Sequence, residues 1–236
     1  MQICSISDLH GNLIHYPSDY WKGLEKCEVL FICGDIIPLD IQFNSVKSLE
    51  WLSKEFKPWV EALPVEKVFI TAGNHDAFFE RHPEGAKSLF PTFEKITYLP
   101  NEYAEYLSTQ DSKLYRIFGT PYCHTFGMWP FMRSEETLKE KYSEIPENID
   151  ILFCHDAPYG VSDVCYQFYP WDKGHKGCPI LREAILEKKP KYCICGHIHT
   201  GNRELTQIEG EDIWTCNASL KNDFYMDVFE PIIFEI

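Results

Sequence analysis

Short runs of apolar residues recur along the chain, and most of them have the length of a buried strand. They are rich in Val, Ile and Phe and show little alternation with polar residues, which is typical of strands covered on both faces. We predict strands at Gln2–Ser7, Val29–Cys33, Lys67–Ala72, Lys113–Phe118, Ile149–Cys154, Tyr192–Cys195, Ile213–Cys216 and from Ile232 onward.

Helical periodicity appears in three segments between these runs. In Phe43–Leu63 the apolar residues recur at steps of three and four, which predicts an amphipathic helix, and Pro58 is expected to kink it. Its apolar face is formed by Leu49, Leu52, Phe56, Val60 and Leu63. Pro179–Lys189 begins with a proline and ends with two lysines, as helices often do, and Ser134–Tyr142 is a third candidate.

The order of these elements predicts an α/β fold. Strands and helices alternate in the first half, which favours parallel pairing. Later strands follow one another with short links, which we interpret as antiparallel ribbons. A sandwich of two mixed β-sheets flanked by helices fits both halves. No long polar, Pro/Gly/Ser-rich or like-charged run divides the chain, so we expect a single domain over residues 1–236.

Polar side chains that can bind metal follow five of the predicted strands, at the point where each strand ends. Ligands collect at the carboxyl ends of strands in open α/β sheets, so we expect these side chains to share one crevice. They are Asp8, His10, Asp35, Asn74, His75, Asp76, His155, His197 and His199. Glycines at 34, 73 and 196 would allow sharp turns as the chain leaves its strands.

These residue types point to divalent metal ions. Carboxylate, amide and imidazole groups are ligands for ions of intermediate hardness, and Mn, Fe, Zn, Ni or Co would all accept such a set. The lack of thiolate ligands argues against a zinc-only site, and we favour Mn. Asp35 is the natural candidate to bridge two ions. A single DxH or HxH pair could be a surface accident, but five such cues in order are hard to obtain by chance.

Two aromatic segments have neither helical nor strand periodicity, Gly119–Arg133 and Tyr159–Cys178. Long irregular segments of this composition often form active-site walls or partner surfaces, or else simply cover the sandwich. A flat group such as a nucleotide base could stack on their aromatic residues Trp129, Phe131, Tyr169 or Trp171. The histidines outside the motifs are expected to be ordinary surface or loop residues: His15, His82, His124 and His175. Of these, His124 and His175 lie in the two aromatic segments and could face the site.

Composition excludes several classes of function. The formal net charge of −14 disfavours broad binding to duplex nucleic acid. No stretch has the length of a membrane span, and the first strand follows Met1 without a signal-peptide pattern, so we expect a cytoplasmic protein without a membrane partner. The ten cysteines are then expected to be reduced, and those inside apolar runs to be buried: Cys4, Cys33, Cys154, Cys193 and Cys195. The sequence does not specify an oligomeric state.

Taken together, the five motifs resemble the calcineurin-like metallophosphoesterases, whose pattern is DxH, GD, GNH[DE], H and GHxH. The resemblance spans residues 8 to 199 and implies the four-layer metallophosphoesterase fold. It implies that Asp8, His10, Asp35 and His199 hold one metal ion, and that Asp35, Asn74, His155 and His197 hold the other. It also implies that His75 lies near the scissile phosphate as general acid or hydrogen-bond donor, with Asp76 orienting its ring.

Some motifs that define other branches of this family are missing from the sequence, which narrows the choice of branch. The phosphate-clamping arginines of protein serine/threonine phosphatases are missing, and Pro38 stands where purple acid phosphatases need a tyrosine. The pieces Gly119-Thr120-Pro121 and Asn217-Ala218-Ser219 are similar to the branch of 239-type metallophosphoesterase-domain phosphodiesterases. This implies hydrolysis of a small, nucleotide-like phosphodiester or phosphomonoester. The alternatives are a non-catalytic metal-binding scaffold of the same fold and a nuclease acting on short oligonucleotides. Substrate-binding residues are not assigned.

Overall fold

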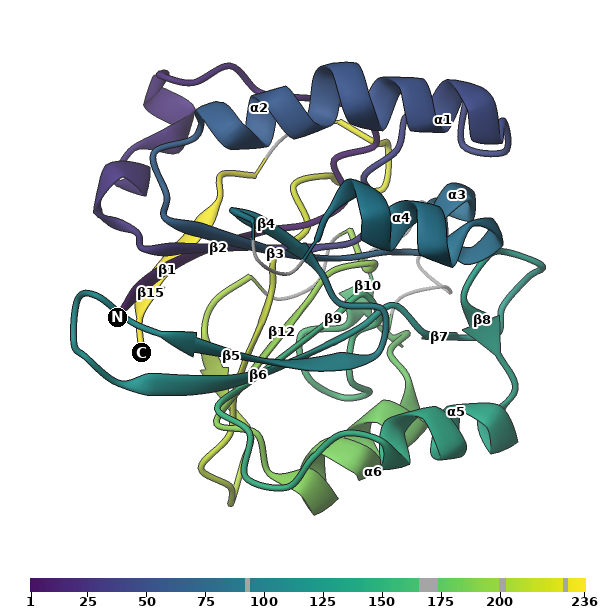
Figure 1. The fold of residues 1–236 in the computed structure, drawn as a ribbon. Coiled ribbons are helices and arrows are strands. Elements are labelled where there is room, and N and C mark those ends of the chain that lie inside the picture. Colours follow the sequence, from purple (N-terminus) through teal and green to yellow (C-terminus); the bar gives the residue numbers. More distant parts are fainter. Residues whose placement is uncertain (92–93, 166–173, 200–202, 227–228) are drawn as a thin grey trace.

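Two β-sheets lie face to face between two layers of helices in the computed structural model (Figure 1). The structure describes residues 1–91, 94–165, 174–199, 203–226 and 229–236. This arrangement confirms the predicted α/β sandwich of two mixed sheets flanked by helices, in four layers.

The first sheet has five strands, with four parallel strands and one antiparallel edge. Its order is β15 (Ile232–Glu235), β1 (Gln2–Ile6), β2 (Val29–Cys33), β3 (Lys67–Thr71) and β4 (Ile96–Tyr98). β15 is the antiparallel strand and pairs with β1. The carboxyl ends of β1, β2 and β3 therefore lie along one edge of this sheet.

The second sheet has six strands and is also mixed. Its order is β13 (Thr206–Gln207), β14 (Trp214–Asn217), β12 (Tyr192–Cys195), β9 (Ile151–Cys154), β6 (Leu114–Thr120) and β5 (Glu102–Leu107). The four central strands are parallel, and only the edge strands β13 and β5 are antiparallel. The expectation of antiparallel ribbons in this half is therefore wrong for its centre, because a helix connects β6 to β9 and another connects β9 to β12 as parallel crossovers.

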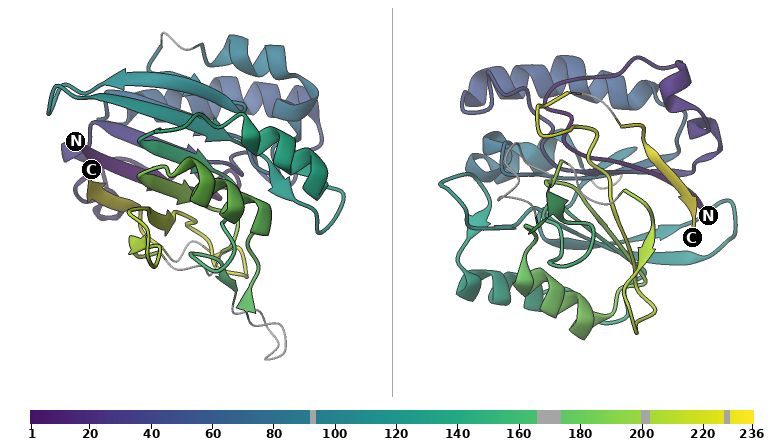
Figure 2. Two further views of the ribbon diagram at one scale, coloured as in Figure 1. Left: turned by 90° about the horizontal axis from the view of Figure 1, so that it is seen from below. Right: turned by 180° about the vertical axis from the view of Figure 1, so that it is seen from behind.

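Helices cover the outer face of each sheet, and α5 and α6 lie side by side on the second one (Figure 2). The first sheet is covered by α1 (Ser45–Trp51), η3 (Leu52–Phe56), α2 (Lys57–Ala62), α3 (Ala77–Arg81) and α4 (Pro83–Leu89). The second is covered by α5 (Glu135–Ser143) and α6 (Pro179–Lys188). Two short 3-10 turns, η1 (Asp19–Trp21) and η2 (Leu24–Lys26), precede β2.

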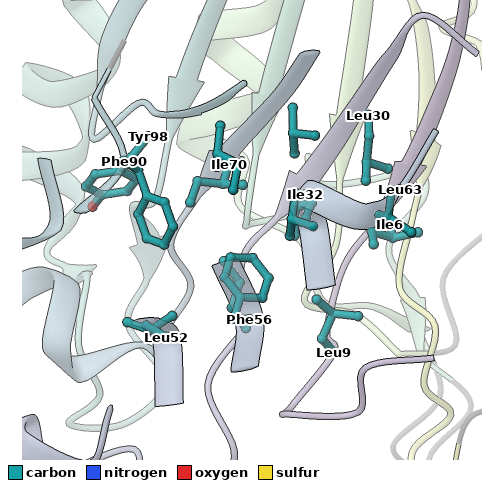
Figure 3. Packing of buried hydrophobic residues seen from close by; sticks show 14 of the residues in the cluster. Ile6, Leu9, Leu30, Ile32, Leu52, Phe56, Leu63, Ile70, Phe90 and Tyr98 are labelled. Carbon is teal, nitrogen blue, oxygen red and sulfur yellow. The ribbon is translucent and has the colours of Figure 1, made fainter. Parts of the chain in front are cut away.

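Buried strand residues divide between the two faces of each sheet, as the continuous apolar runs predict. In β2, Leu30 and Ile32 pack beneath the helices with Phe56, as Figure 3 shows. Phe31 points the other way, into the layer between the sheets, where it contacts Phe153 of β9 at 5.3 Å between ring centroids. A third cluster lies between the second sheet and the helices α5 and α6. The central strands of both sheets are thus covered on both faces, and their ends are left open.

The helix predicted at Phe43–Leu63 is built in three parts along one line at the top of Figure 1. The π-helical turn η3 stands immediately before Pro58, so the proline is accommodated by a wider turn instead of the predicted kink. The wider turn also keeps steps of four residues on one face, and the buried positions are Ser48, Leu52, Phe56 and Val60. Leu49 is 42% exposed, contrary to the sequence prediction.

All eight predicted strands and the helices at 134–142 and 179–189 are present, with ends shifted by a residue or two. The prediction missed β4, β5, β13, α3 and α4, and the short turns η1 and η2. The two aromatic segments also contain short strand pairs: β7 (Cys123–His124) with β8 (Met132–Arg133), and β10 (Val164–Cys165) with β11 (Gly174–His175).

The ten cysteines are free and buried, including the five expected within apolar runs. Each behaves as a small core residue, and burial raises the pKa of most of these thiols, as for Cys33 and Cys195. Among the described residues, no helix is both long enough and apolar enough to cross a membrane.

Candidate metal centre

The ends of strands from both sheets meet at one place. The loops after β1 and β2 are tied together, since the backbone N–H groups of Asp8 and His10 donate to the carbonyls of Gly34 and Asp35, at 3.1 and 2.9 Å. In the second sheet, the backbone N–H of Gly196 donates to the carbonyl of His155 at 3.0 Å. A hydrogen bond between the two sheets brings these loops together, because the backbone N–H of His197 donates to Asp8 Oδ2 at 3.1 Å.

All seven side chains expected to bind metal lie together in this place. Two groups have ligand atoms within 4.8 Å of one another: Asp8 with His10 and His199, and Asp35 with His155 and His197. Asp35 stands between the groups, because Oδ2 is 3.8 Å from His10 Nε2 and Oδ1 is 3.4 Å from His155 Nε2. The side-chain oxygen of Asn74 is 3.0 Å from the same His155 nitrogen.

Backbone carbonyls orient two of the imidazoles. His155 Nδ1 is 2.7 Å from the carbonyl of Cys33, and His199 Nδ1 is 3.1 Å from the carbonyl of Asn222. A proton on each Nδ1 would leave Nε2 with its lone pair toward the carboxylates, which is the usual arrangement of a metal-binding histidine. His199 Nε2 is indeed 3.5 Å from Asp8 Oδ1.

The backbone is strained at the residues of this centre. Asp8, His10, Asp35 and His197 all have positive φ angles, of 58°, 45°, 52° and 66°. L-residues seldom adopt this left-handed conformation, and it is typically held in place by the surrounding structure at functional sites. Here the left-handed conformation turns the backbone sharply after each strand, so that neighbouring side chains face the same crevice.

Glycines make room for this crowding in two ways. Gly34 has a φ of +93° and provides the expected sharp turn. Gly73 does not have positive φ, but a Cβ there would overlap the Asp35 carboxylate and the ring of His155. A Cβ at Gly196 would meet the Ser7 side chain and Asp8 Oδ2. The second and third glycines are therefore needed for close approach and not for a turn.

Burial and charge set the protonation of the cluster. Burial lowers the pKa values of His10 and His197 to about 4, so both rings are neutral near pH 7. Burial opposes protonation of His155 too, but the adjacent Asp35 carboxylate outweighs it and raises the pKa of this ring to about 10. In turn, and against the effect of burial, His155 and His75 hold the pKa of Asp35 well below its usual value.

The donor set fits divalent cations. Asp8 Oδ1 and both ring nitrogens of His10 are buried without a hydrogen-bond partner among the described residues. Such unpaired buried atoms cost about 1–3 kcal/mol each, whereas a cation would satisfy them. Two sets of carboxylate and imidazole donors, joined by one carboxylate, suit two ions of intermediate hardness.

His75 lies beside the ligands, and its partner differs from the expected one. The ring packs edge-on against His10, with 5.1 Å between centroids, and Nδ1 is 2.8 Å from the side-chain oxygen of Gln42. The Asp76 carboxylate instead accepts hydrogen bonds from the backbone N–H groups of Ile36, Ile37 and Gly73. Asp76 therefore fixes the two loops that carry Asp35 and Asn74, and Gln42 orients the ring.

A pocket of about 550 Å³ opens above this centre. Its lining consists of Asp35, Asn74, His75, His124, Phe126, Trp129, Cys165, Lys176, His197, Ile198, His199, Asp223 and Tyr225. Of the aromatic residues proposed to stack on a base, Trp129 lines the pocket, Phe131 is buried elsewhere in the core, and Tyr169 and Trp171 lie outside the described residues.

His124 is a pocket residue that the motif pattern did not assign. Its backbone N–H donates to Asp156 Oδ2, and its ring nitrogen Nδ1 is 2.8 Å from the same oxygen. This buried carboxylate raises the pKa of His124 although burial of the ring lowers it. The other histidines behave as expected: His175 pairs with Asp163 outside the pocket lining, and His15 and His82 are exposed.

Comparisons with known proteins agree with this geometry. The model of the calcineurin-like phosphoesterase family matches residues 1–201. Human metallophosphoesterase domain-containing protein 1 is 29% identical over 199 residues, and the match covers 78% of this chain but 59% of the human protein. The crystal structure of TT1561 of Thermus thermophilus aligns with a TM-score of 0.55 at 12% identity, over 94% of this chain and 89% of the other. The structure described as GAP50, the anchor in the inner membrane complex of Plasmodium, aligns at 0.52 with 13% identity, over 98% and 76%.

Proposed function

Because the chain belongs to the calcineurin-like phosphoesterase family, we propose that it is a hydrolase that cleaves phosphoesters with divalent metal ions bound in the centre described above. The observation that carries the proposal is the joining of two ligand groups by Asp35, with His75 beside them at the floor of one pocket. The fold alone would not support it, since related folds serve different functions.

We assign the seven candidate ligands to two metal positions. Asp8, His10, Asp35 and His199 would hold one ion, and Asp35, Asn74, His155 and His197 would hold the other. Divalent ions bound in such sites would polarise the phosphoryl group by stabilising negative charge on its oxygens, and would lower the pKa of bound water to about 7. Mn is the favoured ion, and Fe, Zn, Ni or Co would suit the same donors.

His75 supplies the chemistry that the ligands do not. With Nδ1 held by Gln42, Nε2 is the ring nitrogen left for a group in the pocket. There it hydrogen-bonds a phosphoryl oxygen or gives a proton to the leaving oxygen, as a positioned imidazole does in general acid catalysis. His124, fixed by Asp156, presents a second imidazole to the same pocket.

The substrate is a small phosphodiester or phosphomonoester, and we favour a nucleotide-like one. A pocket of about 550 Å³ has the size usual for small-molecule sites. The formal net charge of −14 disfavours duplex nucleic acid, although short oligonucleotides would meet less repulsion.

The experiment that tests this function is a panel of phosphomonoesters and phosphodiesters, with cyclic nucleotides included, assayed with Mn added. We expect turnover that depends on metal and disappears with a chelator. A fully metal-loaded chain that turns over none of them would instead favour a non-catalytic scaffold, a reading consistent with the anchor role named for the Plasmodium protein of this fold.

Asp35 provides the test of a two-ion centre. Asp35→Asn weakens a ligand shared by both positions, so we expect metal content to fall at both. One ion per wild-type chain under saturating metal supply would contradict the bridging role.

A further inference from the structure

Three aromatic side chains stand around the metal centre, and we call Phe126, Trp129 and Tyr225 the aromatic collar. All three line the pocket. Each packs against an imidazole of the floor: Phe126 against His197 at 5.2 Å, Trp129 against His75 at 4.6 Å, and Tyr225 against His199 at 4.8 Å, between ring centroids. Each ring of the collar therefore packs against a different imidazole of the polar floor.

The collar leaves apolar surface open to solvent. Phe126 is 58% exposed and Tyr225 is 45% exposed. Scattered exposed apolar residues are ordinary in soluble proteins, but several aromatic rings grouped at the mouth of a pocket mark a ligand-binding surface.

Tyr225 is held in its place by a strained loop. Its φ is +59°, a conformation that bulky side chains rarely adopt. The side-chain oxygen of Asn222 accepts hydrogen bonds from the N–H groups of Phe224 and Met226, and its backbone carbonyl accepts one from Tyr225 N at 2.8 Å. The same carbonyl contacts His199 Nδ1, so one residue positions both a candidate metal ligand and a collar ring.

Trp129 is supported from behind. Its ring stacks on Phe43 with 5.9 Å between centroids and 23° between planes, and the guanidinium of Arg81 lies over the Phe43 ring at 5.7 Å. Rigid aromatic groups bind flat ligands with little loss of conformational freedom.

Among the described residues, the pocket has few groups that would recognise a hydroxyl-rich or multiply charged substrate beyond its phosphate. Among the described residues of its lining, Lys176 is the one Lys or Arg, and Asp223 is an additional carboxylate outside the metal centre. A sugar phosphate or a polyphosphate would need more donors than these described residues offer, because each buried polar group requires a partner.

Resting on the function proposed above, we propose that the collar is the binding site for a flat aromatic group of the substrate. The site then selects phosphoesters that carry an aryl or heteroaromatic ring over those with small alkyl or polyol groups. The phosphate lies on the polar floor, and the ring packs edge-on or face-on against Phe126, Trp129 or Tyr225, as aromatic pairs do.

Binding of two phosphonates tests the collar without any turnover. Phenylphosphonate and methylphosphonate share a charged head and a P–C bond that is not hydrolysed, so their affinities differ through the ring. We would measure both by titration calorimetry on the Mn-loaded chain. We expect phenylphosphonate to bind about tenfold more tightly, the order of one or two aromatic contacts.

Variants locate the selectivity. Phe126→Ala and Tyr225→Ala should each reduce the phenyl-to-methyl affinity ratio about threefold or more, while Tyr225→Phe keeps it. Trp129 is left intact because it packs on His75, whose displacement metal analysis would not detect, whereas Phe126 and Tyr225 pack on candidate metal ligands, whose displacement it would detect. Tyr103→Ala is the matched control, since this aromatic side chain is 41% exposed on strand β5, outside the pocket lining, and should not change the ratio. Metal content and Tm of each variant confirm that the chain is folded.

The possible outcomes separate the collar from the proposed function. Equal affinities in the wild type, or a ratio that neither alanine variant changes, would overturn the collar proposal while leaving the phosphate floor intact. Absence of binding by both phosphonates would overturn both proposals. Selective binding of phenylphosphonate by a chain that is inactive on the whole panel would support the collar and overturn only the hydrolase.

Discussion

His75 is the single residue whose loss should separate chemistry from metal binding. It contacts the candidate ligand His10 and lines the pocket but completes neither candidate ligand group. We expect His75→Ala to keep the metal content of the wild type and to lower kcat by about 10²–10⁴-fold, the usual contribution of a positioned acid or base. Steady-state kinetics with metal analysis checks this, and full activity in the variant would refute the role.

Gln42 allows a graded version of the same test. It holds His75 Nδ1 but is not part of the pocket lining. Gln42→Ala should therefore lower kcat less than His75→Ala does, by about tenfold, because the ring remains but is less well oriented. An equal loss in both variants would mean that Gln42 contributes more than orientation.

Gly73 tests the crowding within the centre. Gly73→Ala should release metal and lower the free energy of unfolding by more than about 2 kcal/mol, because the added Cβ overlaps Asp35 and His155. Gly85→Ala is the control: it lies in helix α4 with only ordinary contacts, at 3.6 Å, and should be neutral or stabilise by about 0.5–1 kcal/mol. Thermal unfolding with metal analysis distinguishes the two, and equal Tm values would contradict the crowding.

At this scale the sequence predicts residues that directly follow strands and little else. Asp8, Asp35 and His155 could be grouped because the ends of buried strands converge. Gln42 and Tyr225 could not, because they reach the site from loops whose paths depend on tertiary contacts. The prediction that Asp76 orients the His75 ring was wrong, because its carboxylate accepts hydrogen bonds from three backbone N–H groups instead. Two of these groups come from a loop distant in sequence, so the sequence pattern could not indicate them.

At the scale of elements, Glu28 ties the β5–β6 hairpin of the second sheet to strand β2 of the first. It is 1% exposed, and its carboxylate accepts hydrogen bonds from Tyr106, Ser108 and the backbone of Thr109. Burial alone would raise the pKa of Glu28, but these bonds outweigh it and lower the pKa from its ordinary value. The ionised carboxylate therefore stabilises the contact between the sheets.

Glu28→Gln should lower the free energy of unfolding at pH 7 by about 1–3 kcal/mol, the value of hydrogen bonds to a charged group. Because the pKa of Glu28 is depressed in the folded state, this stabilisation is present above the unfolded pKa of about 4.3 and is lost as pH falls through the folded pKa. The gap in Tm between wild type and variant should thus shrink in acid. Glu209→Gln, at an exposed position, is the control, and a gap that stays constant with pH would argue against the assignment.

Strand direction was the main error at this scale. The helices at 134–142 and 179–189 were predicted correctly, and each lies between two strands of the second sheet. A helix between strands indicates a parallel crossover, and this signal was available in the sequence. Strand β4 is buried but has only three residues, and the edge strand β5 has exposed residues at alternate positions, so neither gives a long apolar run in the sequence.

For the whole molecule, metal binding should be visible as stability. The centre joins loops from both sheets and leaves buried donor atoms unpaired in the protein alone, among the residues that the structure describes. Removal of metal with a chelator should lower Tm, and added Mn should raise the free energy of unfolding by about 2.7 kcal/mol at about a hundred times its Kd. Differential scanning calorimetry over a range of Mn concentrations checks this, and a Tm independent of Mn would contradict a built metal centre.

The layered architecture followed from the sequence because apolar runs and helical stripes report which surfaces must be covered. That residues 1–236 act as one domain, and that the protein is cytoplasmic, both stay predictions. The match covers only 59% of the length of human metallophosphoesterase domain-containing protein 1. The activity of that longer protein is therefore not transferred to this chain.

The left-handed backbone at Asp8, His10, Asp35 and His197 has a consequence for how the site tolerates substitution. Asp, Asn and His are several-fold enriched among the non-glycine residues that adopt this conformation, and they are also the residues that ligate intermediate cations. The backbone conformation and the ligand chemistry therefore both restrict these positions to nearly the same few residue types. Glu can bind such cations but is not enriched in the left-handed conformation. We therefore expect Asp35→Glu to reduce metal binding as much as loss of the carboxylate does.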